Sequence, residues 1–251
     1  MLNTTVSLTK NLSSLSPSCS LPLRRASSHS SSQWVERQNR DIYVRKARYD
    51  NYRARSAYKL IQLDDKFKFL RPGHFVVECG AAPGAWTQVI CERLELKKDD
   101  ENLPLKERKS TCLAIDLRDF EGVDGAICLG NVDFCSPFTQ AKLLNWLDGQ
   151  RIDCLLSDMA PTATGIKSYD HETIINLNKR LLRFGRQVLK GGSGVIVCKI
   201  WDGAFANELK DELRTCFQYV KTHKPQASRS DSSESYIIAR DFRLSACQPL
   251  K

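Results

Sequence analysis

The stretch that decides the fold is Val76-Val77-Glu78-Cys79-Gly80-Ala81-Ala82-Pro83-Gly84-Ala85-Trp86. An apolar run stops at an acidic residue, a turn of small residues follows, and a helical pattern then begins. This order is typical of the end of a first parallel strand, where a helix N-terminus and small side chains let a nucleotide-type cofactor approach the backbone. Ala-Ala-Pro separates Gly80 from Gly84, so the glycine spacing of dinucleotide-binding proteins is absent. The turn therefore favours a smaller adenosine cofactor, such as S-adenosylmethionine, over the nicotinamide dinucleotide of a dehydrogenase.

Apolar runs and amphipathic segments alternate along the chain on both sides of this turn. The candidate strands are residues 74–78, 111–116, 125–129, 152–157, 194–199, 217–221 and 235–239. Helical spacing of apolar residues covers 55–70, 86–94 and 174–188, and Gly191-Gly192 ends the last of these segments. The alternation predicts a doubly wound, mainly parallel α/β sheet that binds ligands at the carboxyl ends of its strands. Residues 97–109 are dense in charge and are predicted to form a surface loop.

Length and charge indicate one domain with a polyanionic partner. The chain has 251 residues, which is room for a domain of about 200 residues plus a tail. Its 38 Lys and Arg residues outnumber 29 Asp and Glu residues and give a net charge of +9, which favours a nucleic acid as partner. The longest apolar runs are far shorter than the ~20 residues that cross a bilayer, so we expect no membrane partner.

Cysteine usage indicates free thiols. The chain contains ten cysteines but no C-x-x-C pair, and only four histidines are present, so no metal site is predicted. Half of the cysteines lie in or beside candidate strands, where a thiol behaves as a small apolar side chain: Cys79, Cys112, Cys128, Cys154 and Cys198. Many free thiols are typical of a reducing compartment.

The N-terminal segment has the composition of an organellar transit peptide. Residues 1–33 contain no acidic residue and are rich in Ser and Thr, with Lys10, Arg24 and Arg25 as basic residues. The mitochondrial matrix is the predicted destination; plastid targeting and an unaddressed tail remain as alternatives. We expect the domain proper to cover residues 34–242, followed by a C-terminal tail of residues 243–251.

A basic, tyrosine-rich segment begins the predicted domain. Residues 36–59 hold eight Arg or Lys residues against three acids, interleaved with Tyr43, Tyr49, Tyr52 and Tyr58. Cations bind phosphates and flat rings stack on splayed bases, so this segment is predicted to bind RNA. The phosphate contacts are expected from residues that precede the cofactor pocket and should not affect it: Arg45, Lys46, Arg53 and Arg55. The alternative is a solvated basic helix.

Four further motifs lie in order along the chain. They are Arg53-Ala54-Arg55-Ser56-Ala57-Tyr58-Lys59-Leu60, Ser157-Asp158-Met159-Ala160-Pro161, Val197-Cys198-Lys199-Ile200-Trp201 and Ser232-Ser233-Glu234-Ser235-Tyr236. With the Gly80 turn, they make residues 40–239 resemble the FtsJ/RrmJ family of ribose 2′-O-methyltransferases. The resemblance implies a Rossmann-like class I methyltransferase with a seven-stranded sheet, its last strand antiparallel and helices on its faces. It also places Lys59, Asp158, Lys199 and Glu234 on the family's Lys-Asp-Lys-Glu tetrad.

The cofactor implied by this resemblance is S-adenosylmethionine. Asp116 ends the second strand, where a carboxylate accepts hydrogen bonds from ribose hydroxyls, and Asp133 is matched to the adenine amino group. Asp158 would face the methyl donor. The methionine moiety would be wrapped by the turn after the first strand, through Gly80, Pro83, Gly84, Ala85 and Trp86. Glu78 stands where the resemblance leads us to expect aspartate.

Methyl transfer to a ribose hydroxyl requires alignment of donor and acceptor and removal of the hydroxyl proton. We expect Lys199 to accept or steer this proton. Lys59 and Glu234 would orient Lys199 and the ribose, and Asp158 would hold Lys199.

The predicted function is 2′-O-methylation of a uridine in mitochondrial large-subunit rRNA. The motifs Ser157–Gly165 and Ala81–Trp86 resemble those of the bacterial-type and mitochondrial rRNA branch more than those of the tRNA branch. We expect a monomer that acts on this rRNA or on the assembling large subunit during ribosome biogenesis. Two alternatives are a tRNA ribose methyltransferase and a catalytically silent RNA-binding assembly factor.

Overall fold

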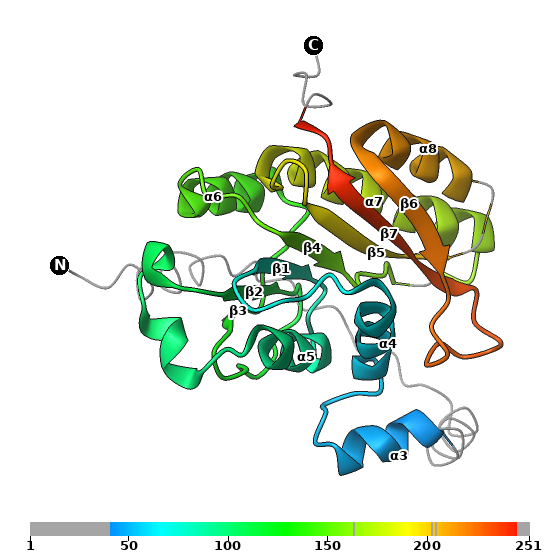
Figure 1. The fold of residues 1–251 in the computed structure, drawn as a ribbon. Coiled ribbons are helices and arrows are strands. Elements are labelled where there is room, and N and C mark those ends of the chain that lie inside the picture. The colour runs from blue at the N-terminus through cyan, green and yellow to red at the C-terminus, as the bar shows by residue number, and fades with distance from the viewer. Residues whose placement is uncertain (1–40, 163, 202, 204, 245–251) are drawn as a thin grey trace.

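The computed structural model describes residues 41–162, 164–201, 203 and 205–244. The predicted transit peptide at 1–33, the first residues of the basic segment and tail residues 245–251 lie outside this range. The described residues form a seven-stranded sheet with helices on both faces (Figure 1). This is the α/β architecture expected from the alternation of apolar strands and amphipathic segments.

The sheet has the strand order β3-β2-β1-β4-β5-β7-β6. The strands are β1 Phe75–Cys79, β2 Thr111–Ile115, β3 Ile127–Leu129, β4 Cys154–Ser157, β5 Val195–Trp201, β6 Phe217–His223 and β7 Glu234–Phe242. Strands β1 to β5 pair in parallel, whereas β7 pairs antiparallel with both β5 and β6. The predicted mainly parallel sheet with an antiparallel last strand is confirmed.

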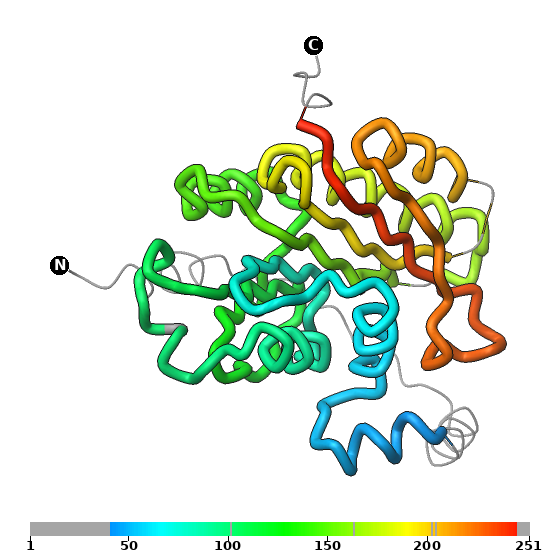
Figure 2. The backbone as a smooth tube through the Cα atoms, viewed as in Figure 1, coloured from blue at the N-terminus to red at the C-terminus, as the bar shows by residue number. Residues whose placement is uncertain are grey.

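Helices cover the sheet as two layers. On one face lie α4 (Ala57–Phe67) and α5 (Ala85–Leu94), whose buried side chains share a core with β1, β4, β5 and β7. The opposite face is covered by α6 (Pro137–Leu147), α7 (Lys167–Val188) and α8 (Ala206–Cys216). A further helix, α3 (Ile42–Tyr49), projects from the body of the domain beside α4 (Figure 2).

The strand ends fall at one edge of the sheet. Cys79 is in register with Ile115 on one side and with Ser157 on the other. The next residues of the three strands, Gly80, Asp116 and Asp158, therefore emerge together. This edge is where the sequence predicts the ligand site.

Residues 97–109 form the expected surface connection, with two short 3-10 helices, η1 (Lys98–Asn102) and η2 (Leu105–Glu107). The eight cysteines of the described residues are free thiols. Within the same residues, no group of His, Cys, Asp and Glu side chains is arranged to hold a metal ion. In this part of the chain, no helix combines the length and apolar character needed to cross a membrane.

Candidate active site

Four charged side chains meet as two ion pairs at the ends of the strands. Lys199 Nζ lies 3.0 Å from Asp158 Oδ1 and also donates to the Asp158 carbonyl oxygen. Lys59 Nζ lies 2.7 and 2.8 Å from the two carboxylate oxygens of Glu234. The four side chains are between 9% and 18% exposed, so they are largely withdrawn from water yet open to a substrate. The residues that the sequence assigns to a tetrad are thus brought together.

Strand pairing explains how residues so distant in sequence meet. Lys199 lies opposite Tyr236 in the β5–β7 ladder, and Trp201 lies opposite Glu234. Because side chains alternate along a strand, Glu234 and Tyr236 point to the same face. The Asp158 backbone N–H donates to the carbonyl oxygen at the end of β1, which fixes the loop after β4 beside them.

Tyr236 joins this cluster although no role for it was predicted. Its hydroxyl donates to Asp158 Oδ1 over 2.7 Å, and its ring lies 5.6 Å from the ring of Trp86. Burial, and then the charges of Asp158 and Glu234, raise the pKa of Tyr236 well above its usual value, so the phenol stays a donor. The available signal was its position two residues after Glu234 on one strand.

The charge state of Asp158 follows from its neighbours. Burial by itself raises the pKa of this carboxyl. The charges of Lys199 and Lys59 outweigh burial, and the Tyr236 hydrogen bond adds to them, so the pKa lies below its ordinary value. The Asp158 carboxylate is therefore ionised at neutral pH.

The turn after β1 requires glycine at both of its ends. Gly80 has φ +84°, and a Cβ there would lie 2.7 Å from the backbone nitrogen of Met159. Gly84 has φ +101° and stands at the N-cap of α5. The turn is joined to β2 because the N–H groups of Gly80 and Ala81 both donate to the Ile115 carbonyl oxygen. Glycine at these two positions lets the Met159 backbone and the Arg53 side chain approach the turn closely.

Asp116 joins two loops in this structure. Its Oδ2 accepts the Ala82 N–H at 2.8 Å, and its Oδ1 accepts the Arg118 N–H at 2.8 Å. Each carboxylate oxygen has a second lone pair, so Asp116 keeps acceptor capacity for ribose hydroxyls. Asp116 therefore holds two loops in place, in addition to its predicted role in cofactor binding.

The other predicted cofactor contacts differ in exposure. Asp133 is exposed after β3, and its Oδ1 accepts the Cys135 N–H at 2.8 Å. Pro83 is exposed, whereas Ala85 and Trp86 are buried. The Trp86 indole points into the core and donates to the Ser56 carbonyl oxygen, so only its backbone can face a ligand at the turn. Contact of these residues with the cofactor stays a prediction.

The basic segment is divided between surface and core. Arg45, Arg48 and Tyr49 are exposed on α3, and Tyr49 is 87% exposed. Arg53 instead donates to backbone carbonyls of the cofactor turn and its neighbour loop, and Arg55 pairs with Asp41. These two arginines were expected to bind phosphates and to leave cofactor binding unaffected. The Arg53 guanidinium, however, donates to the Pro83 carbonyl oxygen of the cofactor turn.

Three of the four tyrosines in this segment pack against one another, with Tyr58 buried and Tyr43 and Tyr52 half-buried. Tyr43 and Tyr52 lie 5.5 and 5.7 Å from the Tyr58 ring. Lys46 adds to this cluster, with its ammonium 4.8 Å from the same ring centroid. The sequence alone does not distinguish tyrosine rings that pack α3 onto α4 from rings that stack on RNA bases. Of the four tyrosines, Tyr49 is the exposed one.

Two cavities lie near the cluster. One, of about 320 Å³, opens beside the Lys59–Glu234 pair and is lined by Arg55, Lys59, Arg229, Asp231, Ser232 and Glu234. A second, of about 530 Å³, lies beside the cofactor turn and the loop after Asp116, and is lined by Arg53, Ala82, Pro83, Arg118, Asp119, Phe120 and Glu121. The first cavity leads to the Lys59–Glu234 pair and is lined by three basic and two acidic side chains.

Parallel strands extended by an antiparallel β7, with the glycine turn after β1, define the fold of a Rossmann-like methyltransferase whose cofactor is S-adenosylmethionine. The chain belongs to the FtsJ-like methyltransferase family, which matches residues 52–242. The resemblance deduced from the motifs is confirmed.

Similar proteins agree with this membership. The chain is 43% identical over 216 residues to "rRNA methyltransferase 2, mitochondrial" of Drosophila melanogaster, covering 86% of this chain and 84% of that protein. It is 43% identical over 220 residues to "Ribosomal RNA large subunit methyltransferase E" of Cereibacter sphaeroides, covering 88% and 87%. A crystal structure of a ribosomal RNA methyltransferase from Plasmodium falciparum matches with a TM-score of 0.63 and 30% identity, over 76% of this chain and 98% of that one.

The residues at the strand ends fit S-adenosylmethionine. Asp116, Asp133 and Asp158 offer carboxylate acceptors, which suit a ligand that carries hydroxyls, an amino group and a cationic sulfur. Gly80 lets the turn after β1 approach the backbone of Met159, the residue after Asp158, so the turn and Asp158 lie on the same edge of the sheet.

Proposed function

We propose that the protein transfers a methyl group from S-adenosylmethionine to the ribose 2′-hydroxyl of a uridine in mitochondrial large-subunit rRNA. The observation that carries this proposal is the meeting of the Lys199–Asp158 and Lys59–Glu234 pairs beside the cofactor turn. The names of the Drosophila and Cereibacter proteins support rRNA as the substrate class, and the first supports the mitochondrion. Naked rRNA or an assembling large subunit would be the partner, bound by a monomer.

The reaction assigns a task to each of the four charged residues. S-adenosylmethionine, when bound, supplies a methyl group on a cationic sulfur. Lys199 accepts the hydroxyl proton when its side chain is the neutral amine, or steers the hydroxyl when it is the ammonium, and Asp158 holds its Nζ in place. Glu234 binds Lys59 through both carboxylate oxygens, and this fixed pair orients the ribose. Tyr236 keeps Asp158 in place through its hydroxyl.

Mapping 2′-O-methylation across organellar and cytosolic RNA, with and without the protein, tests the function. Loss of one modified uridine in mitochondrial large-subunit rRNA is the expected result. Loss of a tRNA modification instead would identify a tRNA methyltransferase. An unchanged profile, together with absent binding of S-adenosylmethionine by the purified protein, would identify a silent RNA-binding factor.

The exposed cations of α3 are expected to bind the RNA backbone. Replacing Arg45 and Arg48 with Gln should weaken RNA binding and lower the log–log salt slope by about 0.7 to 0.9 for each lost phosphate contact. Titrations at several salt concentrations measure this slope. The matched control replaces Lys97 and Lys106, two exposed cations of the 97–109 segment, which removes the same charge. Equal slopes for the two variants would show that α3 is only a solvated basic helix.

The N-terminal segment is proposed to direct import into the mitochondrial matrix. Removal of residues 1–33 should abolish import of the tagged protein and leave the activity of the purified enzyme nearly intact, because the segment precedes the methyltransferase domain. Fusing residues 1–33 to a reporter protein provides the matched gain-of-import control. Import of the truncated protein would contradict this assignment, and delivery of the reporter to plastids would support the alternative address.

A further inference from the structure

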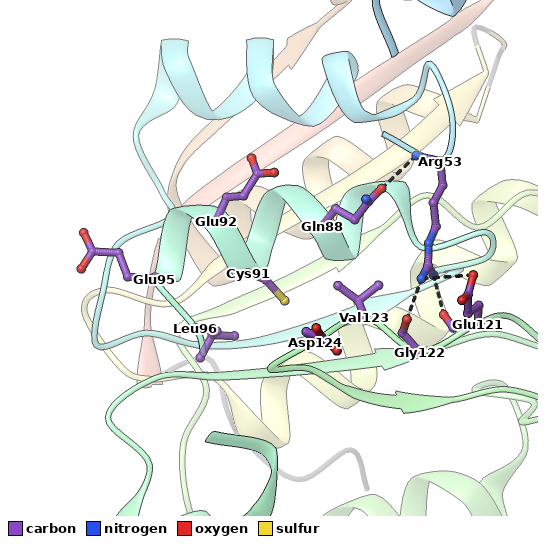
Figure 3. Close-up of a pocket in the computed structure, with 10 residues that line it drawn as sticks. All are labelled: Arg53, Gln88, Cys91, Glu92, Glu95, Leu96, Glu121, Gly122, Val123 and Asp124. Carbon is purple, nitrogen blue, oxygen red and sulfur yellow. Dashed lines mark hydrogen bonds and ion pairs between the residues drawn. The ribbon is translucent and has the colours of Figure 1, made fainter. Parts of the chain in front are cut away.

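Arg53 connects the linker between α3 and α4 to two loops at the ends of the strands. Figure 3 shows its contacts with Glu121 and Gly122 of the second loop and with Gln88 of α5. Its Nη1 donates to the Pro83 carbonyl oxygen at 3.1 Å and to the Glu121 carbonyl oxygen. Its Nη2 donates to the Gly122 carbonyl oxygen at 2.6 Å. The guanidinium is thus bonded to the cofactor turn on one side and to the loop that follows Asp116 on the other.

The surroundings of Arg53 hold it in this position. Its backbone N–H donates to Gln88 Oε1 at 2.9 Å, and the Gln88 amide donates to the Asn51 carbonyl oxygen at 3.0 Å. Its side chain is 22% exposed. A Cβ on Gly84 would lie 2.6 Å from Arg53 Nη1, so the glycine makes room for the guanidinium as well as for the positive φ.

The loops that Arg53 joins are those that carry the cofactor contacts. Gly80 and Gly84 belong to the first loop, and the second begins at Asp116. One link between the two loops is the hydrogen bond from the Ala82 N–H to Asp116. Arg53 adds a second link, at Pro83 and at Glu121 and Gly122, through the planar set of guanidinium donors, which fixes both distance and orientation.

We propose that Arg53 is a positioning residue for S-adenosylmethionine, which holds the turn after β1 and the loop after β2 at the separation the cofactor requires. It acts through the backbone of these loops and not through contact with RNA. This inference rests on the cofactor assignment made above. It also explains why a basic residue of the predicted RNA-binding segment turns toward the domain.

Arg53→Ala and Arg53→Lys in the full-length protein test the proposal. The dissociation constant for S-adenosylhomocysteine, measured by calorimetry, should rise about tenfold or more in Arg53→Ala, because several charge-assisted bonds are lost. Lysine keeps the charge but cannot bond three carbonyl oxygens with a planar fork, so Arg53→Lys should resemble Arg53→Ala. In steady-state kinetics, KM for S-adenosylmethionine should rise while kcat at saturating cofactor changes less than about twofold.

Arg45→Ala provides the matched arginine control. It should weaken RNA binding and leave the affinity for S-adenosylhomocysteine unchanged, whereas the Arg53 variants should do the reverse. An unchanged cofactor affinity in Arg53→Lys, or a loss confined to RNA binding, would overturn the proposal. If Arg53→Ala does not fold, the dissociation constant of Arg53→Lys for S-adenosylhomocysteine tests the proposal. Failure of the unsubstituted protein to bind S-adenosylhomocysteine would instead reject the cofactor assignment.

Discussion

Lys199→Ala is expected to lower the rate of methyl transfer by about 10²-fold or more, the usual size of a general-base contribution. Lys199 is 9% exposed on its side chain and lies 3.0 Å from Asp158, at the end of the strand that reaches the substrate edge. Cofactor affinity should change little, because the turn after β1 and Asp116 lie on other strands. Single-turnover methylation at saturating RNA and cofactor measures the chemical step.

Two further variants separate proton transfer from charge and from cofactor binding. Lys199→Arg keeps a cation but cannot act as a base near neutral pH, so it should be nearly as slow as Lys199→Ala. Asp116→Asn should show the opposite pattern, with weaker cofactor binding and a smaller loss of rate at saturation. Asparagine retains one acceptor oxygen, which leaves one of the two backbone N–H groups at Asp116 unpaired.

Turnover like that of the unsubstituted protein in Lys199→Ala would remove Lys199 from the mechanism. Full activity in Lys199→Arg alone would show that a positive charge, and not a base, is what the reaction needs. Thermal unfolding of each variant is the necessary control, because removal of Lys199 leaves the Asp158 carboxylate without its ion-pair partner.

Local sequence patterns were sufficient to predict the sheet and the edge that holds the site. The apolar run at Val76 and the turn at Gly80 specify β1 and the start of α5, and the other strands begin and end within three residues of their predicted bounds. Strand ends locate Asp116 and Asp158 directly, since parallel strands present their carboxyl ends at one edge. The grouping of Lys59 with Glu234 came from the family resemblance.

The remaining features depend on long-range contacts that no local pattern contains. Tyr236 reaches Asp158 because the β5–β7 register places it opposite Lys199. Arg53 and Arg48 have the same local composition around them, yet one bonds the cofactor turn and the other is exposed. Trp86 sits in a turn motif, but its indole completes the packing against Tyr236. Each difference is decided by which elements the fold brings together.

The stability of the domain is expected to fall with rising pH because of Glu78. This side chain is 0% exposed in β1; its Oε2 accepts a 2.7 Å hydrogen bond from Thr87, and its Oε1 has no hydrogen-bond partner. Burial is the main cause that raises the pKa of Glu78 from 4.5 to about 8, with the charges of Asp158 and Asp116 adding to it against the Thr87 hydrogen bond. The folded protein therefore carries a neutral Glu78 at pH 7.

The sign of the pH dependence follows from proton uptake. Between pH 4.5, where the unfolded carboxyl titrates, and pH 8, where the folded one does, the folded state binds one more proton at this site. The free energy of unfolding should then fall by about 1.4 kcal/mol for each pH unit in this window. The stabilisation is complete below pH 4.5 and lost above about pH 8.

Glu78→Gln isolates this contribution, because glutamine is a neutral side chain of the same length. The buried amide changes the free energy of unfolding by an amount that does not depend on pH. The difference in free energy of unfolding between the variant and the unsubstituted protein should therefore shift by roughly 3 kcal/mol in favour of the variant from pH 5 to pH 7.5. Urea unfolding at several pH values measures both curves, and Glu107→Gln, on the exposed 97–109 segment, is the matched control. If the free energy of unfolding varies with pH in the same way for the Glu78→Gln and unsubstituted proteins, Glu78 is ionised in the folded state. Contacts other than the Thr87 hydrogen bond would then compensate the burial of its charge next to Asp116 and Asp158.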